Sequence, residues 1–407
     1  MKIDPAEQGW LGEPETKAVM QALGEARFVG GAVRNALLGT PVTDIDIAVP
    51  VPPEETMRRL EAAGIKAVPT GFDHGTVTAI KNNKVFEVTS LRRDIETDGR
   101  HAVVAYTDKW EEDAARRDFT INALYAAPDG QVFDYTGGLE DLRAGRVRFV
   151  GDPRARIAED YLRILRLFRF HAWYGKGDMD AEGLHAAAEA RAGLKQLSGE
   201  RIAKELLRLL ACANPAPALR VMAASGILQE LLPFALELAR LERMAHIDAE
   251  NSFLPDPVLR LAALLPDDKS VAQKVSERLK LPGADRDRLE ELAGAGRFAP
   301  PSPPEVRRLL YRNGVRTFRD RVRLAWASTA PGSSAIAWRM LLTIADGWKT
   351  PRFPLSGHDV MQAGVPEGPI VGKVLAAVED WWIENEFPED QSVLSQKLKQ
   401  AVQAHCA

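Results

Sequence analysis

The feature that most limits the fold of this chain is a change of sequence pattern near residue 150. Before that point, short apolar runs alternate with polar residues, as at 44–49 and 84–89, which is typical of strands. After it, apolar residues recur every three to four positions, which is typical of helices. The sequence therefore predicts an α+β protein, with a mixed α/β N-terminal part followed by helices only.

Several further elements are expected. Strands are predicted at 28–29, 103–107 and 132–135, and helices at 32–38, at 155–173 as one long helix, and after Ser198, which is placed as an N-cap. Residues 118–124 are read as the start of an amphipathic helix. The proline-rich segment 300–304 is the clearest linker signal.

Length and composition exclude several classes of protein. The 407 residues suggest about two to four domains. With 45% hydrophobic and 27% charged residues, the chain is neither disordered, nor collagen-like, nor a disulfide scaffold. It has no run of 18 apolar residues and no apolar segment typical of a signal peptide. Two cysteines, Cys212 and Cys406, cannot supply a four-ligand zinc site, so a reducing, cytoplasmic location is expected.

The charge is distributed unevenly. A net charge of −4 argues by itself against a nucleic-acid-binding protein. However, residues 143–170 carry eight arginines against three acidic residues, and residues 305–323 carry seven against two. Local basic stretches matter more than the total for contacts with phosphates. The alternative is that both stretches are solvated helix faces.

The strongest chemical signal is Asp44-Ile45-Asp46. On a strand, residues i and i+2 point to the same face, so both carboxylates would converge while Ile45 enters a core. Two neighbouring carboxylates on one strand face repel each other unless a cation lies between them. Carboxylates of this kind bind Mg²⁺ in phosphoryl and nucleotidyl transfer. The alternative is an exposed turn or strand face.

Glycines and arginines nearby fit a phosphate ligand. The pair Gly30-Gly31 precedes a predicted helix, so it presents backbone N–H groups to an anion, and Arg34 lies one turn further on. Arg117, which follows Arg116 and precedes Asp118, fits a phosphate clamp. The alternatives are a plain strand-to-helix turn and an N-capping Asp118 bonded to Asn122.

Glu87 is a third candidate carboxylate. In the strand 84–89, Phe86 and Val88 share one face and Glu87 lies on the other. It would complete a metal site or act as a base toward an attacking hydroxyl. The alternative is a solvent-facing glutamate.

The predicted helix 155–173 carries the remaining candidates. Its arginines Arg163, Arg166 and Arg169 are spaced three apart among apolar residues, and internal pairing with carboxylates is the alternative to ligand binding. On one helix, Asp160 and Arg163 share a face, so the aspartate accepts and the arginine donates. Cytosine and adenine each offer an amino donor beside a ring-nitrogen acceptor and match this pair, whereas uracil and guanine present the reverse order.

These segments together resemble a known family. The stretches 28–34 with 44–46, 116–123, 159–166 and 200–205 are similar to the ordered motifs of the bacterial-type (class II) tRNA nucleotidyltransferase and poly(A) polymerase family, in particular the alphaproteobacterial and mitochondrial CCA-adding enzymes. The dense resemblance covers 28–210, and a looser one lies at 357–373. Asn35 departs from the pattern, which usually has Asp there. The sequence has no His-Asp motif of a metal phosphohydrolase, so the phosphohydrolase extension of some relatives is not expected.

The resemblance implies roles for the residues. Asp44 and Asp46 would hold Mg²⁺, with Glu87 as a third catalytic carboxylate. Nucleotide contacts would come from the following residues: Gly31, Arg34 and Arg117 to the triphosphate, Asp160 and Arg163 to the base, and Arg166 and Arg169 as support or phosphate contacts. Residues 94–101 occupy the place of the flexible loop that helps these enzymes change from adding C to adding A.

The resemblance also implies an activity and an architecture. The reaction would be template-independent addition of CCA to the 3′ end of tRNA from CTP and ATP. The alternative is a poly(A) polymerase or an A-adding tRNA nucleotidyltransferase, and a catalytically silent RNA-binding protein is a more distant reading. The expected domains are a nucleotidyltransferase head at 1–148, a helical neck at 149–215, a helical body at 216–300 and a helical tail at 301–407. The tail and its basic stretch would contact the tRNA, and neither a membrane nor an obligate protein partner is expected.

Overall fold

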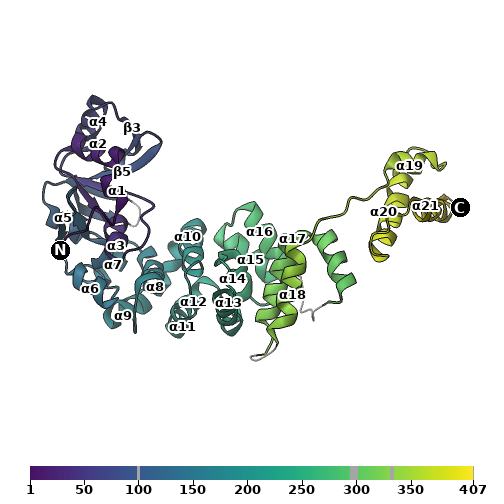
Figure 1. The fold of residues 1–407 in the computed structure, drawn as a ribbon. Helices are drawn as coiled ribbons and strands as arrows, with labels where there is room; N and C mark the ends of the chain where they lie inside the picture. The colour runs from purple at the N-terminus through teal and green to yellow at the C-terminus, as the bar shows by residue number, and fades with distance from the viewer. Residues whose placement is uncertain (99–100, 294–300, 331–333, 407) are drawn as a thin grey trace. The chain divides into compact units, whose positions relative to one another are not determined.

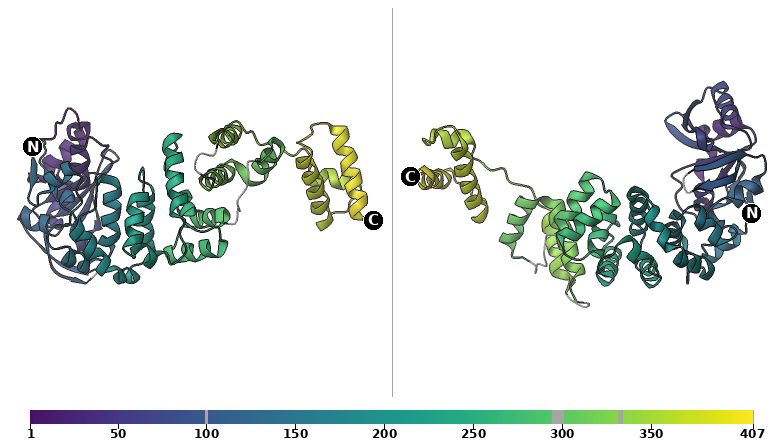
Figure 2. Two further views of the ribbon diagram at one scale, coloured as in Figure 1. Left: turned by 90° about the horizontal axis from the view of Figure 1, so that it is seen from below. Right: turned by 180° about the vertical axis from the view of Figure 1, so that it is seen from behind.

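The computed structural model describes residues 1–98, 101–293, 301–330 and 334–406, and it divides the chain into two compact units. The first comprises Met1–Phe234 with Glu277–Lys280, and the second comprises Ala235–Ser276 with Leu281–Ala407. Strands occur in the N-terminal part and only helices follow, as Figures 1 and 2 show. This confirms the predicted α+β class. No described helix is both long and apolar enough to cross a bilayer.

The first unit is built on a seven-stranded mixed sheet in the order β3-β4-β5-β2-β1-β8-β9. Strand β2 pairs parallel with β5, and the other neighbours are antiparallel. A separate hairpin is formed by β6 and β7. The strands are β1 (Arg27–Val29), β2 (Asp46–Val49), β3 (Lys66–Gly71), β4 (Thr76–Lys81), β5 (Lys84–Ser90), β6 (Arg92–Asp98), β7 (His101–Tyr106), β8 (Leu124–Ala126) and β9 (Val132–Asp134).

Helices cover the sheet and continue beyond it. Helices α2 and α4 pack against the β3–β5 side, and α3 packs against β1 and β8. The helices of the first unit are α1 (Gly9–Gly12), α2 (Pro14–Leu23), α3 (Gly31–Leu37), α4 (Pro53–Ala62), α5 (Trp110–Ala115), α6 (Gly138–Ala144), α7 (Pro153–Glu159), α8 (Leu162–Tyr174), α9 (Ala181–Glu189), α10 (Gly199–Leu210), α11 (Ala216–Ala224) and α12 (Ile227–Leu231), with 3-10 turns η1 (Phe72–His74), η2 (Thr120–Asn122) and η3 (Arg191–Gln196).

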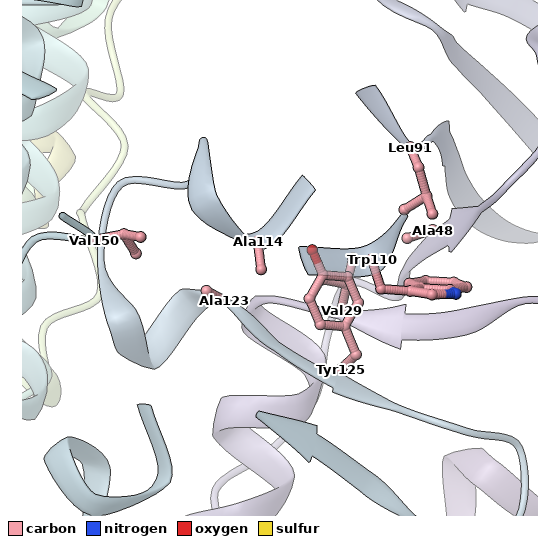
Figure 3. Packing of buried hydrophobic residues seen from close by; sticks show 8 residues of the cluster. All are labelled: Val29, Ala48, Leu91, Trp110, Ala114, Ala123, Tyr125 and Val150. Carbon is pink, nitrogen blue, oxygen red and sulfur yellow. The ribbon is translucent and has the colours of Figure 1, made fainter. Parts of the chain in front are cut away.

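A core cluster holds the central strands against α5. Val29, Ala48 and Tyr125 come from β1, β2 and β8, and Trp110 comes from α5 (Figure 3). The rings of Trp110 and Tyr125 meet edge to face with centroids 5.4 Å apart, a geometry that aromatic pairs prefer. This packing holds in place the central strand β2, which begins at Asp46.

The expected strands at 28–29, 44–49, 84–89, 103–107 and 132–135 all fall on observed strands, with small differences at their ends. Strands β3 and β4 were not anticipated. The predicted helix start at 118–124 is wrong, because a short 3-10 turn leads directly into strand β8 there. Its apolar residues are buried on all sides, so their spacing does not mark one helix face.

The second unit is entirely helical among its described residues. Its helices are α13 (Leu238–Glu250), α14 (Pro257–Leu264), α15 (Lys269–Leu279, whose last residues belong to the first unit), α16 (Gly283–Ala293), α17 (Pro303–Ala327), α18 (Ala335–Asp346), α19 (Gly357–Gln362), α20 (Pro369–Glu384) and α21 (Gln391–Cys406). Part of the predicted linker 300–304 is the first turn of α17, where Ser302 forms a capping box with Glu305. Proline is favoured in a first helical turn, because its missing N–H is not needed there. Residue 300 lies outside the described residues.

The basic stretch 305–323 lies on α17, which is kinked at Gly314, where φ is +76°. Four of its arginines make ion pairs, for example Arg312 with Asp380 and Arg323 with the buried Asp248. The other two are Arg307, paired with Glu386, and Arg319, paired with Asp346. Much of this charge is therefore used within the second unit, and its contact with tRNA stays a prediction.

Candidate active site

The structure brings two of the predicted carboxylates together on neighbouring strands. Asp46 is the first residue of β2, and the parallel pairing with β5 sets it opposite Glu87. Ile45 and Ile47 are buried, as the alternation predicted, and Phe86 and Val88 are buried behind Glu87. Side chains of the intervening polar positions thus emerge on the opposite face.

Asp44 is placed differently from the expectation. It precedes β2 and is exposed. Because Asp44 is not part of the strand, the strand geometry does not place its side chain on the same face as that of Asp46. The Thr43 hydroxyl donates to its carboxylate at 3.3 Å. Asp44 still lies close enough to Asp46 for its negative charge to raise the pKa of Asp46.

The carboxylates repel one another. Burial raises the pKa of Asp46 to about 6, and the negative charge of Glu87 adds to the rise, followed by that of Asp44. The positive charge of Arg117 opposes the rise without cancelling it. Among the described side chains, neither Asp46 nor Glu87 has a hydrogen-bond or ion-pair partner. Among the described residues, the site therefore holds negative charge that no directly paired cation neutralises.

This arrangement fits a divalent cation. In the described part of the chain, no group of three or more His, Cys, Asp or Glu side chains is gathered tightly enough to hold a metal ion. Nevertheless, the repelling carboxylates Asp46 and Glu87, with Asp44 nearby, are oxygen donors of the type that hard cations take. A cation placed between them would remove the repulsion that raises the pKa of Asp46.

The turn after β1 positions Arg34. Gly30 has a backbone φ of +67°, which residues other than glycine rarely adopt, and α3 begins directly after it. Arg34 is buried, and its Nη2 donates to the Tyr174 hydroxyl at 2.8 Å. Its guanidinium lies 4.1 Å from the Tyr174 ring centroid. Among the described residues no carboxylate forms an ion pair with Arg34, so this buried cation is available to an anionic ligand.

Arg117 lies beside the same turn and is held from behind. Its Nη1 is 3.7 Å from the position of a Cβ added at Gly30. Its Nη2 donates to the buried Asp113 at 3.0 Å, and its Nε donates to the Tyr125 hydroxyl at 3.1 Å. Although burial alone would raise the pKa of Asp113, Arg117 and Arg116 hold it at about 2.

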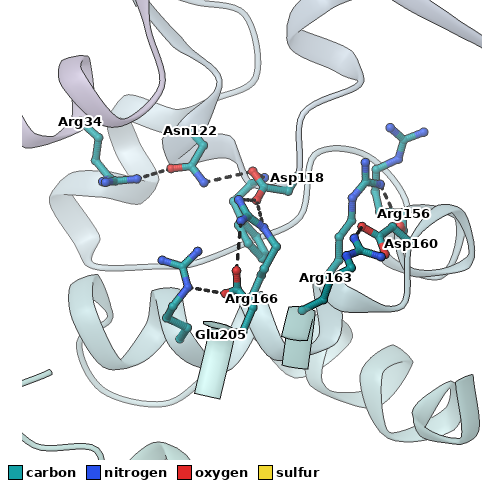
Figure 4. A network of polar contacts seen from close by, with 11 residues as sticks. Arg34, Asp118, Asn122, Arg156, Asp160, Arg163, Arg166 and Glu205 are labelled. Atoms are coloured by element: carbon teal, nitrogen blue, oxygen red, sulfur yellow. Dashed lines mark hydrogen bonds and ion pairs between the residues drawn. The ribbon is translucent and has the colours of Figure 1, made fainter. Parts of the chain in front are cut away.

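A polar network joins α3 and the turn η2 to α8 (Figure 4). Asn122 accepts from Arg34 Nη1 and donates to Asp118 Oδ1 at 3.0 Å. Asp118 Oδ2 in turn accepts from Arg166 Nε at 2.8 Å. Burial opposes ionisation of Asp118, but Arg166 and Asn122 hold its pKa at about 2. The expected hydrogen bond between Asp118 and Asn122 is confirmed, although no helix follows Asp118.

The prediction of one continuous helix over 155–173 is wrong. Helix α7 ends at Glu159, and α8 begins at Leu162. Asp160 lies in the break with extended backbone, φ −156° and ψ 106°. The apolar and arginine periodicity runs through the break, so the sequence pattern gives no sign of it.

The break changes the partners of the predicted base-reading pair. Asp160 Oδ2 accepts from Arg201 Nη2 on α10 at 2.7 Å, and its Oδ1 accepts from the Leu162 backbone N–H at 3.1 Å. Arg163 donates to Glu159 and to the Arg156 carbonyl, the latter at 2.8 Å. Asp160 and Arg163 lie near each other in Figure 4, but they do not form an ion pair there.

The remaining arginines of α8 pair within the protein. Arg169 is buried and forms an ion pair with Glu205 on α10. Arg166 lies 3.6 Å from the same glutamate, in addition to its contact with Asp118. Internal pairing, the alternative kept for these arginines, is therefore what the structure shows for both.

Sequence reasoning missed the residues that hold this site in place. Arg201 and Glu205 lie in the segment 200–205 that resembled a supporting motif, but their partners, Asp160 in the break before α8 and Arg169 on α8, were not foreseen. Tyr174 and Asp113 gave no signal at all. Of the loop predicted at 94–101, the described backbone belongs to the β6–β7 hairpin, and residues 99 and 100 lie outside the described residues.

Comparisons with known proteins identify the family of the chain. The family model "Poly A polymerase head domain" matches residues 26–148, and "Probable RNA and SrmB-binding site of polymerase A" matches residues 178–238. The mitochondrial CCA tRNA nucleotidyltransferase 1 of Homo sapiens is 34% identical over 393 residues, which are 92% of this chain and 86% of that protein. The CCA-adding enzyme of Streptococcus gordonii is 38% identical over 242 residues, 59% of each chain.

A solved structure covers the whole length. The crystal structure of Bacillus stearothermophilus CCA-adding enzyme in complex with CTP matches with a TM-score of 0.78 and 27% identity, over 99% of both chains. Enzymes of this nucleotidyltransferase type are generally metal-dependent. The human relative matches 92% of the chain at 34% identity, and the solved structure covers 99% of it. The chain therefore belongs to the family of CCA-adding tRNA nucleotidyltransferases.

Proposed function

We propose that the protein adds CCA to the 3′ end of tRNA, using CTP and ATP and releasing pyrophosphate. The observation that carries the proposal is the position of the un-neutralised carboxylates Asp46 and Glu87 near Arg117, whose charge acts on Asp46. A carboxylate pair beside a cationic pocket suits a reaction in which a hydroxyl attacks a phosphate. The attacking group is the tRNA 3′-hydroxyl, and the α-phosphate of the nucleotide accepts it.

Asp44 and Asp46 are proposed to hold Mg²⁺, with Glu87 as the third catalytic carboxylate. When bound, the ion supplies charge for the phosphates and lowers the barrier for the hydroxyl. The protein contributes a rigid support, since the paired inner strands β2 and β5 hold Asp46 and Glu87 side by side. Whether Glu87 contacts the ion or accepts the proton of the hydroxyl, it acts from this same position.

The triphosphate is proposed to lie against Gly31, Arg34 and Arg117. Arg34 is suited to this because it is buried with neutral hydrogen-bond partners, so a phosphate would be its only directly bound anion. Arg117 keeps one contact with Asp113 and faces the turn at Gly30. Arg166 and Arg169 hold the neighbouring surface through Asp118 and Glu205.

The base is proposed to be read by Asp160 and Arg163. The Asp160 carboxylate uses two of its lone pairs on Arg201 and Leu162, which fix its direction and leave others to accept from an amino group. Among the described contacts of Arg163 only Nη1 donates, so Nε and Nη2 remain to donate to a ring nitrogen. Cytosine and adenine satisfy both groups, and uracil and guanine do not.

The wider assignments follow from the family. The division into head, neck, body and tail at 1–148, 149–215, 216–300 and 301–407 is proposed on the same basis, with the helical body and tail contacting tRNA. A cytoplasmic location rests on the cysteine content, and some relatives are mitochondrial. No protein partner is needed for the proposed reaction.

The test is single-nucleotide gel analysis with purified protein and Mg²⁺. Three tRNA substrates end before the first C, after the first C and after the second C, and each is given CTP, ATP or both. Stepwise addition of C, C and A that then stops is the expected result. Long A ladders on any RNA would instead indicate a poly(A) polymerase, and addition of A only to the CC-ended tRNA would indicate an A-adding enzyme.

A further inference from the structure

One face of α10 carries three cations, of which two have no described side-chain partner. Arg201, Lys204 and Arg208 lie at positions i, i+3 and i+7, which place them along one side of the helix. Arg201 is bonded to Asp160. Lys204 and Arg208 are exposed, and among the described residues neither side chain has an ion pair or hydrogen bond. This stripe therefore begins at the proposed base-reading residue and continues outward with free positive charge.

An exposed tryptophan lies at the outer end of this stripe. Trp173, near the end of α8, keeps 48% of its surface exposed, although α8 and α10 pack side by side (Figure 1). Its indole N–H donates to the Arg208 carbonyl at 2.8 Å. The hydrogen bond fixes one edge of the ring and leaves much of the rest uncovered. A ring held in this way is an ordered apolar surface beside two free cations.

The surface is close to the proposed triphosphate site. Tyr174, the next residue, is the direct partner of Arg34. Burial lowers the pKa of Arg169, and although Glu205 opposes this, the charge of Arg208 adds to the lowering, so Arg208 lies near the α8 arginines. The region 178–238, which contains Lys204 and Arg208, also matches a family model described as a probable RNA-binding site.

Single-stranded nucleic acids are bound by this combination of groups. Cations follow the phosphates, and aromatic rings stack on the bases. The helical rise between Lys204 and Arg208 is about 6 Å, comparable to one nucleotide step of an extended strand. We propose that Trp173, Lys204 and Arg208 dock the single-stranded 3′ end of the RNA substrate, with one base stacked on Trp173 and phosphates on the two cations. This rests on the proposed function for the identity of the RNA.

The test separates stacking from charge. Affinity for tRNA ending after the second C is measured by filter binding without nucleotides, for Trp173→Ala, Trp173→Phe and the double variant Lys204→Gln/Arg208→Gln. Trp173→Ala is expected to weaken binding roughly tenfold, whereas Trp173→Phe keeps most of the affinity because its ring still stacks. The double variant is expected to lower the salt dependence of binding by about 0.7 for each lost phosphate contact.

Two controls locate the effect. Lys17→Gln/Lys66→Gln removes the same charge from exposed positions of the head without described ion pairs and is expected to change neither the affinity nor the salt dependence. A tRNA with a blunt acceptor stem, which lacks the single strand, should bind wild type and all variants alike. The KM for CTP should also stay within about twofold, because the surface does not touch the nucleotide.

The outcomes decide separately between this inference and the proposed function. Unchanged binding of the CC-ended tRNA by both Trp173→Ala and the double variant would overturn the inference, as would an equal loss on the blunt stem. If Trp173→Ala does not fold, the double variant still carries the test through the salt dependence. Wild type that binds tRNA but adds no nucleotide would instead overturn the proposed function.

Discussion

Two groups of charged residues in the first unit are built in opposite ways. The carboxylates Asp46 and Glu87 lie side by side without a described partner, and burial together with the negative charge of Glu87 raises the pKa of Asp46 to about 6. In the network of Arg166, Asp118 and Glu205, every carboxylate has an arginine, and the pKa of Asp118 is held at about 2. One group is left incomplete by the protein, and the other is complete.

The difference indicates which residues wait for ligands. An un-neutralised carboxylate pair costs stability and is retained where a cation will bind. A satisfied network costs nothing further and holds neighbouring groups in place. Arg34 is an intermediate case between these two kinds of group: it has hydrogen-bond partners, Asn122 and Tyr174, but both are neutral. The following predictions test this contrast, beginning with the largest effect.

Removing a carboxylate of the incomplete group should remove activity and leave the fold intact. Asp46→Ala is expected to lower the rate of nucleotide addition by more than about a hundredfold, since even outer partners of metal ligands cost 10- to 100-fold. Binding of tRNA should stay close to that of wild type. The rate is measured by primer extension, with Glu61→Ala, an exposed carboxylate without a described ion pair, as the matched control. Unchanged incorporation would refute the metal-site assignment.

Removing a carboxylate of the complete network should have the reverse signature. Asp118→Ala leaves Arg166 and Asn122 without their shared acceptor, so we expect a loss of about 3 kcal/mol in the free energy of unfolding. Urea denaturation measures this loss. Asp129→Ala, which breaks an exposed pair with Lys2, is the control and should change stability little. Equal stability of the two variants would contradict the contrast drawn here.

Arg163 lies outside both groups but combines their features, because it is paired with Glu159 and still has N–H donors without a described partner. Arg163→Ala should lower the preference for CTP over UTP, measured as the ratio of kcat/KM values, by roughly tenfold. Arg154→Ala, which breaks the pair with Glu189, should leave the ratio unchanged. A ratio that survives the loss of Arg163 would exclude this residue from base reading.

The smallest effect concerns stability against pH. The pKa of Asp46 is about 6 in the folded protein against an ordinary value of 3.8, so the folded state binds more protons in this window and stability falls as pH rises through it. The low pKa of Asp118 acts in the other direction, because the stability it contributes is lost as pH falls from about 4 to about 2.

Asp46→Asn removes the first of these contributions. Without divalent cations, the variant should have a Tm a few degrees above wild type near neutral pH and little advantage at about pH 4. Thermal unfolding followed by circular dichroism at the two pH values checks this. A variant less stable than wild type near neutral pH would show that Asp46 does not carry unrelieved charge.

The sequence predicted those parts of the molecule that depend on local pattern. Strand alternation located β2 and β5 and buried Ile45, Ile47 and Phe86 correctly, because the two-residue period of a strand is a property of the backbone. The motif order predicted which segments meet at the site. The position of Glu87 beside Asp46 also depends on the parallel register, which the sequence does not specify directly.

Partners in space could not be predicted. Arg166 pairs with Asp118, and Arg169 pairs with Glu205, although other carboxylates are closer in sequence. The helix break at Asp160 was missed because the spacing of the apolar residues and arginines continues through it and no glycine or proline marks it. Tertiary contacts, such as the bond from Arg201, stabilise an extended residue there against local preference.

The parallel pairing of β2 with β5 has a consequence for partly unfolded protein. Parallel neighbours need a crossover, here the segment of α4, β3 and β4, so Asp46 meets Glu87 only after that whole segment is in place. No local hairpin can bring Asp46 and Glu87 together on its own. During denaturation, catalytic activity should therefore be lost at the same denaturant concentration as the sheet, and not at a lower one. Any fragment of the chain that ends before β5 should be inactive.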